Sequence, residues 1–368
     1  MKILFSGPRY HANYNGMIQG LEDAGHEVHF LSLFDDFKYA KSDKTGLHHN
    51  KSFIKVPMIN FGFYKRRFPP NWQYIPNPFA LKKIIREINP DLIIARDLGY
   101  QTVCLKFISM IFKTKFLLYS LWHFETDYKE FSIFNRFLLA TVFRSQNKIT
   151  PVFTSNYPNK TPMRNKKMHA FYFPVINVEK RPTKNVEKVK FLCVSKLDHQ
   201  RKNLKTLIDS ILPLILDNRA TLHIIGSVKD KNSPIYKDLH KVAESTEGIS
   251  IEENLPYQTC ISRYKEFDFF VLSALVEPLG YSILEAWSAG LPVLIADDGG
   301  LSGQVLVGKT GFVFKRNDKE DLVEKLYYIA NHPEMIPEMS KKSLEIVEQN
   351  YQPHIFEKRL MQIYEKLG

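Results

Sequence analysis

The sequence predicts an α/β protein built from two doubly wound, Rossmann-like domains that face an interdomain cleft. Short apolar runs alternate with helical patterns in two series, one starting at Lys2 and the other at Val189. A polar segment, residues 178–187, contains Pro182 and separates the series as a linker would. Repeated strand, helix and strand indicate parallel sheets covered by helices on both faces. A length of 368 residues suits two domains that each bury a core.

We expect the first domain to span residues 1–180, the second 181–350, and a terminal helix 351–368. Apolar runs predict buried strands, and the clearest are residues 2–5, 25–30, 89–95, 116–121, 148–155, 189–194, 222–225, 269–272 and 311–314. Residues 204–216 read as a helix. Residues 355–367 read as an amphipathic helix, because their apolar positions recur at helical spacing.

Composition favours a folded, reduced, cytoplasmic protein. The three cysteines, Cys104, Cys193 and Cys260, are far apart and form no zinc-type spacing. The apolar run at the N-terminus is too short for a signal peptide. The most apolar long window, residues 105–124, contains three lysines, so we do not expect it to span a membrane.

The net excess of positive charge lies entirely in the first half of the chain. Residues 1–180 contain 26 Lys and Arg against 13 Asp and Glu, whereas the remaining residues contain 25 against 26. Basic residues alternate with aromatic ones, as in residues 61–68. Anionic membrane surfaces and nucleic acids both attract this pattern, and a merely soluble basic face is the plain alternative.

The stretch Phe269–Gly300 predicts an anion site flanked by two carboxylates. A buried strand leads into Glu277-Pro278-Leu279-Gly280, and a helix with Glu285 about one turn inside follows. Such a loop aims free N–H groups and a positive helix end at the carboxyl edge of a sheet. Carboxylates beside that anion would accept bonds from sugar hydroxyls. Alternatively, Glu285 caps the helix and Glu277 is a solvated loop residue.

Two cations, Lys196 and Lys202, stand at the end of the strand that begins at Val189 and at the start of the next helix. Six residues apart, they can converge on a diphosphate. Lysine is a point charge without the bidentate fork of arginine, so it should neutralise phosphate but orient it less strictly. The alternative, a merely basic helix start, is weakened because cations oppose the helix dipole at that end.

The motif from Glu277 to Glu285, with Gly290-x-Pro292-Val293 after it, closely resembles the donor-site signature of the retaining glycosyltransferases of family 4. That family has the GT-B fold. The resemblance implies that Glu285 holds the ribose hydroxyls and Glu277 the transferred sugar. It also implies that Lys196 and Lys202 stabilise the departing diphosphate. The backbone N–H groups of Leu279, Gly280 and Tyr281 would help them.

His123 follows a predicted strand at a place where family 4 enzymes often carry a histidine near the sugar; a satisfied core or surface histidine is the alternative. The resemblance also implies that the terminal helix crosses back to the first domain. Three departures stand out: Ser195 and Lys196 replace the family's Gly and Arg, the first loop lacks a Gly-Gly pair, and the common Gly-Gly-x-x-Glu reads Gly299-Gly300-Leu301-Ser302-Gly303 here.

The resemblance implies a hexosyltransferase-type, metal-independent enzyme without a cofactor. It would move a sugar from a UDP-, GDP- or ADP-sugar to a hydroxyl of a saccharide or lipid-linked saccharide. Cell-surface polysaccharide or glycolipid synthesis is the expected setting, with residues 1–180 on the anionic cytoplasmic face of the membrane. A nucleotide-sugar epimerase with the same fold and, in another class, a nucleic-acid-binding module remain alternatives.

Overall fold

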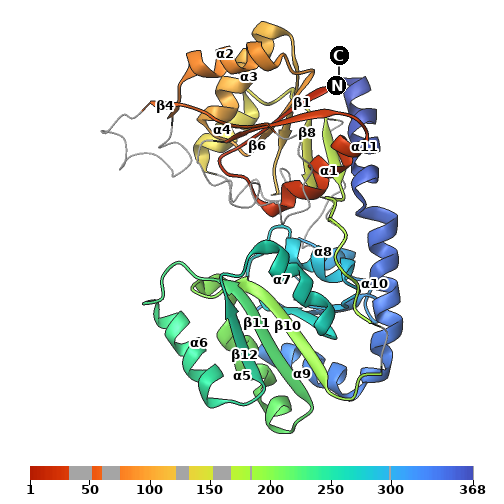
Figure 1. The fold of residues 1–368 in the computed structure, drawn as a ribbon. Helices are drawn as coiled ribbons and strands as arrows, with labels where there is room; N and C mark the ends of the chain where they lie inside the picture. Colours follow the sequence, from red (N-terminus) through yellow and green to blue (C-terminus); the bar gives the residue numbers. More distant parts are fainter. Residues whose placement is uncertain are drawn as a thin grey trace. The chain divides into compact units, whose positions relative to one another are not determined.

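The computed structural model describes residues 1–32, 52–59, 75–121, 132–151, 167–182, 185–297 and 300–367 (Figure 1). It contains two compact units. The first holds the described residues before 152, those from 167 to Pro174, and the chain from Gln352 onward; the second holds Val175–Tyr351. Parallel sheets of seven and six strands confirm the predicted α/β class.

The first unit is built on a parallel sheet in the order β3-β2-β1-β6-β7-β8-β9. Since β1 pairs with both β2 and β6, the strand order reverses there, and the switch point lies between β1 and β6. The strands of this sheet are β1 (Lys2–Gly7), β2 (Glu27–Ser32), β3 (Ser52–Lys55), β6 (Leu92–Arg96), β7 (Lys115–Tyr119), β8 (Lys148–Pro151) and β9 (Met168–Phe171). A separate antiparallel pair is formed by β4 (Met58–Ile59) and β5 (Ile75–Pro76).

Helices cover both faces of this sheet. One apolar core joins the sheet to α2 (Pro78–Ile88), α3 (Tyr100–Phe112) and α4 (Ile133–Ala140). Because crossovers between parallel strands are right-handed, α1 (Asn15–Asp23), which follows η1 (Ala12–Tyr14), takes the opposite face. The terminal helix α11 (Pro353–Lys366) packs on α1 (Figure 1). Gly20 permits that approach, since a Cβ there would lie 2.1 Å from the Pro353 carbonyl oxygen.

The second unit has a parallel sheet in the order β12-β11-β10-β13-β14-β15, and its switch point lies between β10 and β13. The strands are β10 (Val189–Lys196), β11 (Ala220–Ser227), β12 (Ile249–Glu253), β13 (Phe269–Leu272), β14 (Val293–Ala296) and β15 (Gly311–Phe314). The helices are α5 (Leu204–Leu216), α6 (Pro234–Ser245), α7 (Tyr257–Arg263), α8 (Tyr281–Ser288), α9 (Lys319–Asn331) and α10 (Ile336–Asn350). Short 3-10 turns are η5 (Gln200–Lys202), η6 (Tyr264–Glu266), η7 (Ser302–Gln304) and η8 (Pro333–Met335).

The segment that enters the second unit is fixed by a buried ion pair. Nη2 of Arg181 lies 2.8 Å from Oδ1 of Asp268, and Nη1 donates to Ser340 at 2.8 Å. The Val178 N–H donates to Ser288 Oγ at 3.1 Å. Within the ranges described above, the structure contains no helix that is both long and apolar enough to cross a membrane.

Candidate active site

Two loops meet at the carboxyl edge of the second sheet, on either side of its switch point. The loop after β10 contains η5, and the loop after β13 leads to α8. The Leu275 N–H donates to the Arg201 carbonyl at 2.8 Å, and Ser273 Oγ lies 3.1 Å from the carbonyl oxygens of Lys202 and Asn203. Ligands of doubly wound sheets bind at this kind of position.

These bonds bring Lys202 and Glu277 together. The Lys202 ammonium donates to Oε2 of Glu277 in a pair whose side chains are 10% and 17% exposed. The Gly300 N–H donates to the Glu277 carbonyl at 2.8 Å, so Gly300 holds the same loop. Glu277 is therefore fixed through its side chain and its backbone.

Lys196 points to a concentration of positive charge at this edge. Partial burial lowers the pKa of its ammonium, and the charges of Lys229, Arg201 and Lys202 lower it further, against a weaker opposing effect of Asp198. The Glu277 carboxylate pairs with Lys202, and the charges of Lys196, Arg201 and Lys229 at the same edge attract a further anion. The arrangement therefore suits a diphosphate.

Helix α8 begins beside this charge cluster, and its entry requires glycine. Gly280 has φ +74°, and a Cβ there would lie 2.6 Å from Cδ1 of Ile283 and 3.2 Å from Cγ of Glu277. The chain can then turn directly into Tyr281, the first residue of the helix. The N–H groups of Leu279, Gly280 and Tyr281 thus belong to a helix start, the end at which a dipole favours anions.

Glu285 lies one turn into α8 and is only 5% exposed. Its two carboxylate oxygens accept hydrogen bonds from Tyr257 Oη at 2.8 Å and from Tyr264 Oη at 2.9 Å. Burial raises the pKa of Glu285 to about 7, although both tyrosine hydroxyls favour the ionised form. Each oxygen keeps a second lone pair that can accept another hydroxyl.

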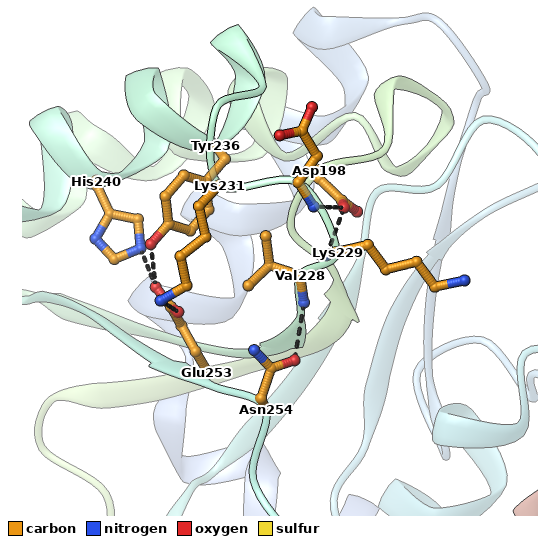
Figure 2. Close-up of polar contacts among 9 residues, drawn as sticks. Asp198, Val228, Lys229, Lys231, Tyr236, His240, Glu253 and Asn254 are labelled. Atoms are coloured by element: carbon orange, nitrogen blue, oxygen red, sulfur yellow. Dashed lines mark hydrogen bonds and ion pairs between the residues drawn. The ribbon is translucent and has the colours of Figure 1, made fainter. Parts of the chain in front are cut away.

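The loop after β11 is held from two sides, as Figure 2 shows. Oδ2 of Asp198 accepts from the N–H groups of Lys229 and Asp230 at 2.7 and 3.0 Å, and Asn254 Oδ1 accepts from the Val228 N–H at 3.1 Å. The two N–H groups hold the pKa of Asp198 below its ordinary value. Lys229 is therefore presented by a fixed backbone.

Beside that loop, three side chains contact the carboxylate of Glu253 (Figure 2). It lies 2.6 Å from Tyr236 Oη and 2.7 Å from both Lys231 Nζ and His240 Nε2. Burial opposes ionisation, but the bonds from Lys231 and Tyr236 hold the pKa of Glu253 below its ordinary value. This cluster joins α6 to the end of β12.

The carboxyl edge of the first sheet carries a polar group at its own switch point. The guanidinium of Arg96, at the end of β6, lies 5.6 Å from the Tyr14 ring centre and 5.9 Å from that of Tyr119. Its Nε is 3.3 Å from Oδ2 of Asp97, a residue with φ +59°. Among the described residues, Nη1 of Arg96 is buried without a hydrogen-bond partner.

The structure therefore gathers Lys196, Lys202, Glu277, Gly280 and Glu285 at one edge of one sheet. His123 lies outside the described residues, as does the basic stretch 61–68. Within the described ranges, no three His, Cys, Asp or Glu side chains are placed to hold a metal ion.

Sequence reasoning missed several residues of this site, namely Arg201, Lys229, Tyr257 and Tyr264, and it also missed Arg96 at the edge of the other sheet. Arg201 could have been predicted from the sequence, because it adjoins Lys202 in the same loop. The two tyrosines could not, because they lie 28 and 21 residues before Glu285 in the chain, and no motif has such a spacing.

Comparison with known proteins shows what the second unit resembles. Residues 176–345 match the model described as Glycosyl transferases group 1. Trehalose synthase of Pyrococcus horikoshii is 33% identical over 101 residues, which are 27% of this chain and 24% of that protein. Sulfoquinovosyl transferase of Arabidopsis thaliana is 34% identical over 119 residues, 29% of this chain and 23% of that protein. The chain thus matches about a quarter of the length of these curated relatives.

Structural similarity extends over the whole chain. Anabaena HepE, solved in complex with UDP and glucose, matches 100% of both chains with a TM-score of 0.74 and 15% identity. At that identity the likeness establishes the fold, and it confirms the predicted GT-B architecture. The chain therefore has this fold throughout, and its residues 176–345 match the model of glycosyl transferases group 1.

Proposed function

We propose that the protein is a retaining glycosyltransferase that moves a sugar from a nucleoside-diphosphate sugar to an acceptor hydroxyl. The observation that carries the proposal is the cation cluster around Lys196, which lies at a sheet switch point beside Glu277 and Glu285. Cations, a helix start and two carboxylates are the groups that a diphosphate between two sugars requires. A UDP-sugar is the first donor to test, because HepE was solved with UDP and glucose.

In this proposal each residue has one task. Lys196 and Lys202 bind the diphosphate with the N–H groups that begin α8. Glu285 accepts ribose hydroxyls, and its carboxylate is held in place by two tyrosines. Glu277, oriented by the Lys202 ammonium, accepts hydroxyls of the transferred sugar. The two carboxylates of the motif thus serve the two sugars of the donor, one each.

The chemical step follows from these roles. The bond between the anomeric carbon and the leaving phosphate oxygen breaks, and negative charge grows on the diphosphate. Lys196 and Lys202 stabilise that charge more in the transition state than in the bound donor, which accelerates the reaction. The acceptor oxygen attacks from the same face and passes its proton to the leaving phosphate. The proposed enzyme needs no metal, because lysine and helix charges replace it.

We assign the acceptor to the first unit. The carboxyl edge of that sheet carries Arg96, and among the described residues no partner accepts a hydrogen bond from its buried Nη1. A buried donor of this kind favours an oxygen-rich or anionic acceptor. The excess of basic residues before position 180 favours an acceptor at an anionic surface, such as a lipid-linked saccharide on the cytoplasmic face of the membrane.

The test is slow hydrolysis of a panel of UDP-, GDP- and ADP-sugars by the purified protein, with and without EDTA. One donor should be consumed, EDTA should not change the rate, and the released sugar should keep its anomeric configuration by NMR. The variant Lys202→Met should lose this activity, whereas Lys205→Met, an exposed lysine on α5, should not. An inverted product refutes the retaining mechanism, and conversion of the donor to an epimer identifies the alternative enzyme.

A further inference from the structure

A second cation cluster lies at the amino edge of the first sheet, the edge opposite Arg96. It lines a cavity of about 750 Å³. The cavity opens where three neighbouring strands begin, because Lys115 starts β7, Asn147 precedes β8 and Lys167 precedes β9. No Asp or Glu is among the described residues that line it, whereas six basic side chains are: Lys106, Lys113, Lys115, Lys167, His169 and Lys366.

Two of these cations are held by hydrogen bonds to backbone carbonyls. Lys115 Nζ donates to the Tyr364 carbonyl at 3.1 Å and stands 4.2 Å from the centre of that ring. Lys167 Nζ donates to the Ser145 carbonyl at 2.7 Å. Burial and then the charge of Lys366 lower the pKa of His169. Several cations gathered in a cavity without a carboxylate among its described lining residues repel one another, and an anion inside the cavity lowers that repulsion.

Exposed apolar side chains lie on the two helices that cover this face of the sheet, and one of them reaches the cavity. Phe107, Met110 and Ile111 of α3 are 53%, 61% and 62% exposed, and Met110 also lines the cavity. On α4, which packs on the same face of the sheet, Ile133 is 80% exposed. Its neighbours Phe134 and Phe137 are exposed as well. Large apolar groups so exposed beside lysines mark a surface that meets both an apolar phase and an anion.

We propose that the outer faces of α3 and α4 dock on an anionic lipid bilayer, with the lysine cavity holding lipid phosphate headgroups. The apolar side chains enter the acyl boundary, and the charges pair with phosphate. A soluble anion would satisfy the lysines but would leave the exposed side chains of α3 and α4 in water. Docking itself does not depend on the proposed function. Its use does, because docking would keep the enzyme near lipid-linked acceptors.

Flotation of the full-length protein with vesicles tests the proposal. Vesicles of phosphatidylcholine with phosphatidylglycerol should carry the protein, and vesicles of phosphatidylcholine alone should not. The triple variant Lys113→Gln, Lys167→Gln, Lys366→Gln should weaken binding about 100-fold, since each lysine near an anionic surface contributes about 5-fold. The pair Phe107→Ser, Ile111→Ser should also weaken it, with all lysines intact.

The matched control removes three exposed lysines of the second unit: Lys205, Lys237 and Lys241. It should change vesicle binding less than about 5-fold, because those lysines lie on α5 and α6. Equal losses in both triple variants would mean that only net charge matters, and they would overturn the proposal. So would binding to a DNA oligonucleotide in place of vesicles. Donor hydrolysis should be normal in every variant, so failure of the docking site is distinguishable from failure of the proposed function.

Discussion

Replacing the buried carboxyl group of Glu285 by an amide should remove the part of the pH dependence of stability that this group causes. In the folded protein the pKa of Glu285 is about 7, compared with an ordinary value of 4.5. Below pH 4.5 the carboxyl group is protonated in both the folded and unfolded states. Between pH 4.5 and 7 the unfolded state loses the proton while the folded state keeps it, so the free energy of unfolding falls as pH rises.

The size of this effect follows from the two pKa values. Their difference corresponds to about 3 kcal/mol lost between pH 4.5 and 8, since one pKa unit is about 1.4 kcal/mol. The variant Glu285→Gln has no such group to ionise. It should therefore be about 3 kcal/mol more stable than the wild type at pH 8, relative to the same comparison at pH 4.5.

Urea unfolding at pH 4.5, 6, 7 and 8 measures this difference. Replacing Trp72 and Trp122 by Phe leaves Trp287, which is fully buried in the second unit, as the fluorescent reporter. Subtracting the wild-type stability from that of the Glu285→Gln variant at each pH cancels the other titrating groups. A difference that stays constant over the pH series would refute the reasoning. Tyr264→Phe provides a second check, because loss of its hydroxyl should raise the pKa of Glu285 further.

Three other changes test the anion site. Lys202→Met should lower kcat about 100- to 1000-fold in donor hydrolysis, because it removes a charge at the leaving group and frees Glu277; a near-normal rate would remove Lys202 from the site. Lys196→Gln should weaken UDP binding about 10- to 100-fold by calorimetry, and unchanged affinity would contradict its phosphate role. Gly280→Ala should lower the free energy of unfolding by about 1–2 kcal/mol, because a side chain at φ +74° strains the turn and presses on Ile283. It should also weaken UDP binding. An unchanged melting temperature would show that the turn tolerates a Cβ.

Local patterns were sufficient to predict most of the fold. Residues 269–272 and 311–314 form the strands expected from their apolar runs, and residues 204–216 form the expected helix. Such elements are buried on both faces or on one stripe, so the sequence period carries the information. Helix 204–216 even contains Pro213, whose ring does not end it. Tertiary packing overrides local propensity there.

The site was predictable as far as the chain topology brings loops together. Strand ends on one edge of a parallel sheet are neighbours, so Lys196, Lys202 and Glu277 follow from strand order and motif spacing. The tyrosines that bond Glu285 do not, because they come from α7 and η6 and depend on how α8 is packed. The raised pKa of Glu285 depends on that packing too, so no sequence pattern predicts it.

The lysine cavity follows from the same rule applied to the other edge of a sheet. Residues before successive parallel strands meet there just as residues after them meet at the carboxyl edge. The charge count of residues 1–180 showed a basic excess but no position for it. Reading the residues around the starts of β7 and β9 together places Lys113, Lys115 and Lys167 at one edge, and α11 adds Lys366. A basic excess becomes a binding site when topology brings it to one edge without carboxylates, and here the neighbouring apolar helices favour a lipid surface as its partner.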